Sequence, residues 1–168
     1  MGRYYKQYDI SWPEQEIEKT AFELEYERGA DRAGILWPVD EAKAPECNWS
    51  KALEDFTGSS INRMFFSKVH RGGLPIHRDH NRLCALNFFV SGDFKNSHNL
   101  FVDDFDEPVE TFNGNKPALM NTRQFHGVQN RTEQPRIVLS VSFYEPYKII
   151  KQRGFNNNEV FYMRNKEK

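Results

Sequence analysis

The residues best suited to chemistry in this sequence are two histidines and an aspartate, His77, Asp79 and His126. In an extended chain, side chains two residues apart project to the same side, so His77 and Asp79 can offer an imidazole and a carboxylate to one point. Two histidines and one carboxylate are the ligand set of non-haem iron(II) sites, which leave metal positions open for reaction. The alternative is a turn in which Asp79 orients an imidazole, with His126 a buried, hydrogen-bonded histidine elsewhere.

An arginine opens the strand-like run that follows His126. Residues 136–143 alternate between an uninterrupted apolar face and a second face that carries Arg136 and Ser140. If the second face lies inside a small barrel, the guanidinium of Arg136 is costly to bury unless it meets a planar anion with two hydrogen bonds. The alternative places this second face in solvent.

Taken in this order, the four residues resemble those of the Fe(II)/2-oxoglutarate-dependent oxygenase superfamily, and the end of the core is similar to that of its prolyl-hydroxylase-like and aspartyl-hydroxylase-like members. In that superfamily a double-stranded β-helix carries His-x-Asp near its second core strand, a distal histidine on the seventh strand and an arginine or lysine on the eighth. His77, Asp79, His126 and Arg136 match these positions one by one. The resemblance covers roughly residues 61–144, and it is strongest over 117–143.

The resemblance implies Fe(II) as cofactor and 2-oxoglutarate as cosubstrate, with Arg136 on the distal C5 carboxylate. Oxidative decarboxylation to succinate would then be coupled to hydroxylation of a substrate, either a peptide or a small molecule. The family's Arg-x-Ser pattern is not kept, so Ser140, further along the same face, is expected beside the cosubstrate. Asn87 is expected there too, because a polar residue inside an apolar strand needs a partner.

Three arginines lie on or beside expected strands near this site: Arg63, Arg82 and Arg123. They are interpreted as contacts for an acidic substrate or for the metal-proximal carboxylate of the cosubstrate, and the alternative is ion pairs at the rim. Three further histidines are interpreted as surface or supporting residues rather than ligands: His70, His80 and His98.

Two other functions stay open. One is a cupin-like metalloprotein that uses the same three ligands without 2-oxoglutarate, in which Arg136 binds the substrate. The other is a non-enzymatic jelly-roll binding module in which the three residues never converge. Release of succinate would separate the first from an oxygenase, and stoichiometric metal would exclude the second.

The elements that must position these residues form a strand-rich core. Seven strand-like runs are separated by turn residues, at 61–69, 82–90, 99–102, 109–112, 117–122, 125–129 and 136–144. Strands at this spacing predict a mainly β sandwich or jelly roll, and the resemblance makes it a cupin-like double-stranded β-helix.

The first sixty residues have a different pattern and are expected to support that core. A helix is predicted from near Trp12, followed by a strand from Phe22, where apolar and acidic residues alternate. Residues 29–45 are predicted as loop, and 50–56 as a short helix that ends at Gly58. We therefore expect a single domain over 1–168, with its core at about 61–144.

Composition narrows the class of protein. The chain has 168 residues and two cysteines, which excludes a disulfide scaffold and a four-thiolate zinc site and suits a reducing cytoplasm. Lys and Arg number 23 against 24 Asp and Glu, so the strong positive field that nucleic-acid binding requires is missing. No apolar run reaches the length of about 18 residues that a membrane helix needs. A cytoplasmic protein without a nucleic-acid or membrane partner is expected, and its oligomeric state is left open.

Overall fold

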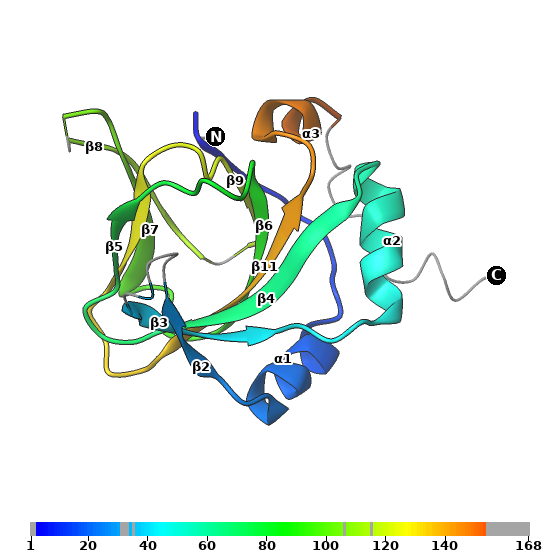
Figure 1. The fold of residues 1–168 in the computed structure, drawn as a ribbon, viewed down its shortest axis with the longest axis horizontal. Helices are drawn as coiled ribbons and strands as arrows, with labels where there is room; N and C mark the ends of the chain where they lie inside the picture. Colours follow the sequence, from blue (N-terminus) through cyan, green and yellow to red (C-terminus); the bar gives the residue numbers. More distant parts are fainter. Residues whose placement is uncertain (1–2, 31–33, 35, 106, 115, 154–168) are drawn as a thin grey trace.

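Two antiparallel β-sheets face each other, and helices cover the outer side of the larger one (Figure 1). The computed structural model describes residues 3–30, 34, 36–105, 107–114 and 116–153. The major sheet contains, in spatial order, β1 (Tyr5–Gln7), β9 (Ala118–Met120), β6 (Ala85–Ser91), β11 (Arg136–Phe143), β4 (Ile61–Val69), β3 (Leu36–Lys43) and β2 (Glu27–Ala30). The minor sheet contains β5 (Leu74–His77), β10 (His126–Asn130), β7 (Ser97–Val102) and β8 (Pro108–Asn113). The expected mainly β architecture is confirmed.

Strand β11 is the centre of the major sheet. It pairs with β4 on one side and with β6 on the other, and all eight of its residues are buried. Its polar face, which includes Arg136 and Ser140, therefore lies between the two sheets and not in solvent. Of the two positions considered for this face, inside a barrel or in solvent, the inside position is correct.

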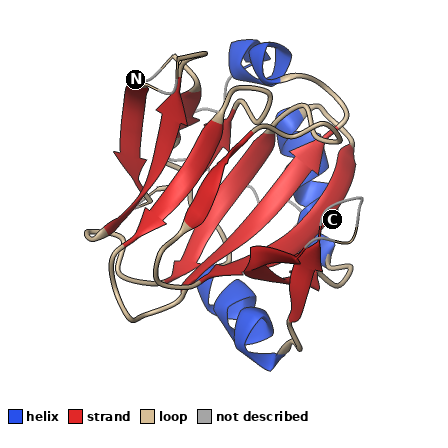
Figure 2. Ribbon diagram, turned by 60° about the vertical axis from the view of Figure 1, so that its left-hand side comes forward, coloured by secondary structure: helices blue, strands red, loops and turns tan. Residues whose placement is uncertain are grey.

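The other face of β11 packs against the helices α1 (Glu14–Glu23), α2 (Asn48–Thr57) and α3 (Tyr147–Arg153). Figure 2 shows these helices gathered behind and beside the strands. One buried cluster joins strand and helix side chains: Leu139, Val141, Phe143, Ile17, Ala21, Trp49, Leu53 and Ile150. Helix α2 ends as expected at Gly58, whose left-handed φ of 67° lets its N–H donate to the Glu54 carbonyl at 2.9 Å.

A cluster of aromatic rings fills one end of the space between the sheets. Tyr5, on β1 of the major sheet, stacks on Phe112 of the minor sheet with ring centroids 4.1 Å apart, and Phe101 lies beside both. Glu110 of β8 accepts hydrogen bonds from the backbone N–H groups of Tyr4 and Arg3. The first strand of the chain therefore links the two sheets at this end.

All seven expected runs contain a strand, but the strand expected from Phe22 is wrong. Helix α1 continues to Glu23, and β2 starts only at Glu27. Ile17 and Ala21 are buried one turn apart, so the helical face continues to this point while Phe22 points outward and is 62% exposed. Packing of the helix on the sheet decided against the local alternation.

The loop expected over 29–45 is also wrong. Strand β3 occupies Leu36–Lys43 and pairs with β2 and β4, with Val39 opposite Val69; residues 31–33 and 35 lie outside the described residues. The Gly- and Pro-rich composition favoured a loop, whereas pairing with the long strand β4 imposes an extended chain. In the described part of the chain, no helix has the length and apolarity needed to cross a bilayer.

Candidate metal centre and its cavity

His77, Asp79 and His126 come together between the sheets. His77 and His126 are direct partners on the neighbouring strands β5 and β10, and their ring centroids are 4.5 Å apart. One ligand atom from each of the three residues lies within 4.8 Å of the others. Asp79 is not in a strand: β5 ends at His77, and the turn that follows is held by a hydrogen bond from the Asp79 N–H to the Thr122 carbonyl at 2.9 Å. The turn, rather than strand alternation, brings the carboxylate to the histidines.

Each histidine is oriented by a hydrogen bond at Nδ1. The His77 Nδ1 donates to the Pro75 carbonyl at 2.8 Å, and the His126 Nδ1 donates to the Gln124 carbonyl at 2.7 Å. A carbonyl oxygen only accepts, so the proton of each neutral ring sits on Nδ1 and Nε2 keeps its lone pair. Burial lowers the pKa of His77, and it lowers that of His126 to about 4. Both rings are therefore neutral at neutral pH, the form that a metal binds.

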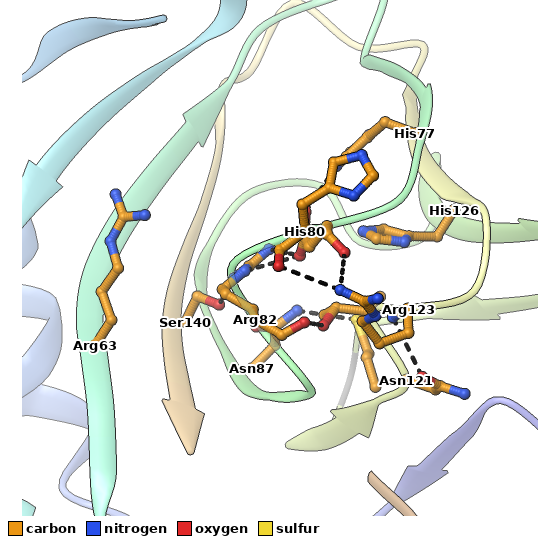
Figure 3. A network of polar contacts seen from close by, with 12 residues as sticks. Arg63, His77, His80, Arg82, Asn87, Asn121, Arg123, His126 and Ser140 are labelled. Atoms are coloured by element: carbon orange, nitrogen blue, oxygen red, sulfur yellow. Dashed lines mark hydrogen bonds and ion pairs between the residues drawn. The ribbon is translucent and has the colours of Figure 1, made fainter. Parts of the chain in front are cut away.

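Two arginines hold Asp79. Arg82 donates from Nε at 2.8 Å and from Nη2 at 2.6 Å to Oδ2, while Oδ1 faces the His77 Nε2 at 3.5 Å. Arg123 donates from Nη1 to the backbone carbonyls of Asp79 and His80, both at 3.2 Å. Arg82 thus occupies Oδ2 of Asp79, whereas Oδ1 faces the histidines. Figure 3 shows the two imidazole rings close together, with Arg82 and Arg123 below them and Arg63 apart on β4.

Of the three arginines predicted to contact the substrate or the cosubstrate, Arg82 and Arg123 are therefore directed at the turn that carries Asp79. Arg63 differs, because it lines the cavity with its guanidinium 4.5 Å from the Phe65 ring, and its nearest carboxylate, Glu41, is 3.9 Å away. Among the other histidines, His70 hydrogen-bonds Asp40 at 2.7 Å, while the exposed His80 lines the cavity without belonging to the group of three.

A cavity of about 520 Å³ lies next to the three residues and is lined by both sheets. The predicted cosubstrate residues Arg136, Ser140 and Asn87 all line it. The Ser140 Oγ accepts a hydrogen bond from Arg82 Nη1 at 2.8 Å. The Asn87 Nδ2 contacts the Met120 sulfur at 2.9 Å, and its Oδ1 is buried with no partner among the described residues.

Arg136 is a buried cation that pairs with no carboxylate in the described part of the chain. Its side chain is 1% exposed, and its Nη2 donates to the Asn99 Oδ1 at 2.9 Å. Its Nε and Nη1 have no hydrogen-bond partner among the described residues, and no carboxylate of those residues pairs with it. Phe89 and Phe94 flank the guanidinium at 5.2 and 5.9 Å. Burial lowers the pKa of Arg136 to about 9, which reflects how poorly an unpaired charge is solvated there.

Two lining residues were missed by the sequence interpretation. Asn99 is the hydrogen-bond partner of Arg136. Trp37 makes a T-shaped contact with the His77 ring, with ring centroids 4.7 Å apart. The signal for Asn99 was its position on β7, where it shares a face with the buried residues Ser97 and Phe101. A polar side chain on an inward face needs a partner. Trp37 lay in the range predicted as loop.

Comparison with known proteins gives structural relatives only. No protein-family model matches the chain, and neither does any curated protein. The crystal structure of an oxidoreductase of the 2OG-Fe(II) oxygenase family from Burkholderia pseudomallei matches 76% of this chain and 78% of that one, with a TM-score of 0.54 and 13% identity. The non-heme alpha ketoglutarate dependent epimerase SnoN from nogalamycin biosynthesis matches 78% and 70%, with a TM-score of 0.54 and 13% identity. This chain shares their fold.

The three converging residues also suit a metal by their chemistry. Two imidazole nitrogens and one carboxylate oxygen are donors that Fe(II) accepts, and three ligands leave further positions for small molecules. The outer hydrogen bonds to Pro75, Gln124 and Arg82 fix the ligands in the way that metal sites require. The donor set and its supports therefore fit an iron(II) ion.

Proposed function

We propose that this protein is an Fe(II)- and 2-oxoglutarate-dependent oxygenase, which couples oxidative decarboxylation of 2-oxoglutarate to hydroxylation of a peptide or small-molecule substrate. The observation that carries the proposal is a cavity with His77, Asp79 and His126 on its wall and, inside it, the cation Arg136, which no carboxylate of the described residues balances. 2-Oxoglutarate has a metal-binding 2-oxo acid at one end and a carboxylate at the other. The cavity offers a partner for each end, and the shared fold agrees with this function.

The residues of the chain have distinct tasks in this proposal. His77, Asp79 and His126 would hold the iron, and bound iron supplies the oxidative chemistry together with 2-oxoglutarate and dioxygen. Arg82 keeps the Asp79 carboxylate turned so that one oxygen remains available. Arg136 binds and orients the distal carboxylate of the cosubstrate, and its aromatic neighbours exclude water from that contact.

The substrate would enter where Arg63 and Trp37 line the cavity. Since Arg82 and Arg123 are engaged at Asp79, Arg63 is the member of the predicted set that is placed to bind an acidic group on the substrate. The reducing cytoplasm expected for the two free cysteines, Cys47 and Cys84, would also keep iron in its ferrous state.

Succinate release is the direct test. The purified protein is incubated with Fe(II), 2-oxoglutarate and oxygen, with and without a panel of candidate acceptors, and succinate is measured. We expect slow release without acceptor, faster release with the correct one, and none with His126→Ala. Stoichiometric metal without any succinate would favour the cupin-like alternative, and the absence of stoichiometric metal after purification under reducing conditions would favour a binding module.

A further inference from the structure

Asn99 and Arg136 meet across the inside of the cavity. Asn99 lies on β7 of the minor sheet and is 2% exposed, whereas Arg136 lies on β11 of the major sheet and is 1% exposed. The hydrogen bond from Arg136 Nη2 to Asn99 Oδ1, 2.9 Å long, joins the two side chains directly. Residue 99 therefore shares the environment of the buried cation.

This hydrogen bond fixes the orientation of the Asn99 amide. A guanidinium has only donors, so the oxygen of the amide must face it and the Nδ2 group must point elsewhere. The Asn99 Nδ2 has no partner among the described residues, and the same holds for Nε and Nη1 of Arg136. This hydrogen-bonded pair therefore carries three buried nitrogen donors that have no acceptor among the described residues.

The chemistry of these groups selects the ligand end that fits them. A carboxylate accepts hydrogen bonds at both oxygens, and its negative charge balances the positive charge of the guanidinium. A hydroxyl or an amide would leave that positive charge unbalanced. The neutral amide at position 99 matters for the same reason. An aspartate there would neutralise Arg136 within the protein, and the ligand's carboxylate would then meet a site with no net positive charge.

We propose that Asn99 is a specificity-determining residue, which restricts the cavity to 2-oxo acids that carry a second carboxylate. Its Oδ1 aligns Arg136, and its Nδ2 donates to the distal carboxylate beside the guanidinium. The inference rests on the proposed function, because it names a further contact for the cosubstrate of that reaction.

The decisive variant is Asn99→Asp, with Mn(II) replacing iron so that no turnover occurs. The binding of 2-oxoglutarate is compared by titration with that of pyruvate, which has the same 2-oxo acid but no second carboxylate. We expect the wild type to prefer 2-oxoglutarate by about 100-fold, and Asn99→Asp to lose most of this preference while binding pyruvate as before. The melting temperature of the metal-free variant should rise, because Arg136 gains a buried counter-ion.

A second variant and a control complete the experiment. Asn99→Ala removes the amide donor without adding charge, and it should weaken 2-oxoglutarate binding by about tenfold with pyruvate unchanged. Asn113→Asp places the same new charge on the exposed face of the neighbouring strand β8 and should match the wild type in every measurement.

The outcomes separate this inference from the function on which it rests. If the wild type binds Mn(II) but neither 2-oxo acid, the proposed function fails, and the role of Asn99 fails with it. If the wild type prefers 2-oxoglutarate and both Asn99 variants keep that preference unchanged, the function stands and the role of Asn99 is wrong.

Discussion

The two sheets contribute to one cavity in different ways. The minor sheet supplies the two candidate metal-binding histidines, His77 from β5 and His126 from β10, and both strands are only partly buried. The major sheet supplies Arg136 from β11, a strand that is buried on both faces because helices cover its outer side. The difference teaches that the two candidate metal-binding histidines and the fully buried core strand lie on separate layers. Replacing a minor-sheet residue should therefore disturb less packing than replacing one on β11.

The largest expected effect is the loss of metal from His126→Ala or His77→Ala. Each substitution removes one of three ligands, so iron or Mn(II) should bind at least 100-fold more weakly while the fold is retained. Metal content after purification under reducing conditions, together with circular dichroism, measures both properties. Wild-type metal content in both variants would remove the minor sheet from the metal site.

The reverse effect is expected for Leu139→Ala on the major sheet. Leu139 is fully buried in the cluster shared with the helices, so its truncation should lower the free energy of unfolding by about 2–5 kcal/mol. Ile76→Ala on β5, where the side chain is 39% exposed, should cost less than about 1 kcal/mol. Urea unfolding of both variants measures this difference. Equal losses in the free energy of unfolding would contradict the proposed contrast between the two sheets.

Arg136→Ala should affect cosubstrate binding rather than metal binding. Removing a buried guanidinium that pairs with a carboxylate costs about 2–4 kcal/mol, or roughly two orders of magnitude in 2-oxoglutarate affinity. Arg131→Ala, in the exposed turn before β11, is the matched control and should behave as the wild type. Unchanged 2-oxoglutarate affinity in Arg136→Ala would favour the cupin-like function.

Arg82 connects the two layers, because it binds Asp79 next to the minor sheet and Ser140 on β11. Arg82→Met keeps the length of the side chain but releases the Asp79 carboxylate, so metal affinity should fall about tenfold. Arg78→Met serves as a control, since Arg78 lies over the Phe125 ring and makes no ion pair with Asp79. Equal metal affinities in the two variants would show that Asp79 needs no such support.

The smallest effect concerns the metal-free protein in acid. Burial lowers the pKa of His126 from 6.5 to about 4, so the unfolded chain takes up a proton more readily than the folded one. The contribution of neutral His126 to stability is complete above pH 6.5 and is lost as the pH falls toward 4. Between pH 7 and pH 5.5 we expect the free energy of unfolding to fall by about 1 kcal/mol. His126→Gln should weaken this pH dependence of the free energy of unfolding. An unchanged pH dependence would contradict a lowered pKa for His126.

The sequence predicted the strands that carry their own local signal. The long strands β4 and β11 have alternating or continuous apolar faces bounded by turn residues, and their predicted limits agree with the structure to within one residue. Strands β1, β2, β3 and β5 were not predicted, because they are short or rich in Pro and charge and become extended only by pairing with a neighbour.

The candidate site shows the same division. His77, Asp79, His126 and Arg136 could be selected from their types and order, and the groups that orient the first three lie two or three residues away in the chain. The long-range contacts of Arg136 and Ser140 could not be predicted. Asn99 lies 37 residues before Arg136 in the chain, and Arg82 lies 58 residues before Ser140. No local pattern encodes contacts between side chains on strands that meet only after the two sheets have formed.

The position of β1 has a consequence for how the protein reaches its native state. Tyr5 pairs with Met120 and Gln7 with Ala118, so β1 is made long before its partner β9, which lies near the end of the core. Contacts between such distant residues close slowly, because the intervening chain must lose its conformational freedom first. During synthesis, Phe101 and Phe112 therefore remain uncovered after the strands that bear them have been made. During this interval the exposed aromatic side chains favour aggregation of the nascent chain.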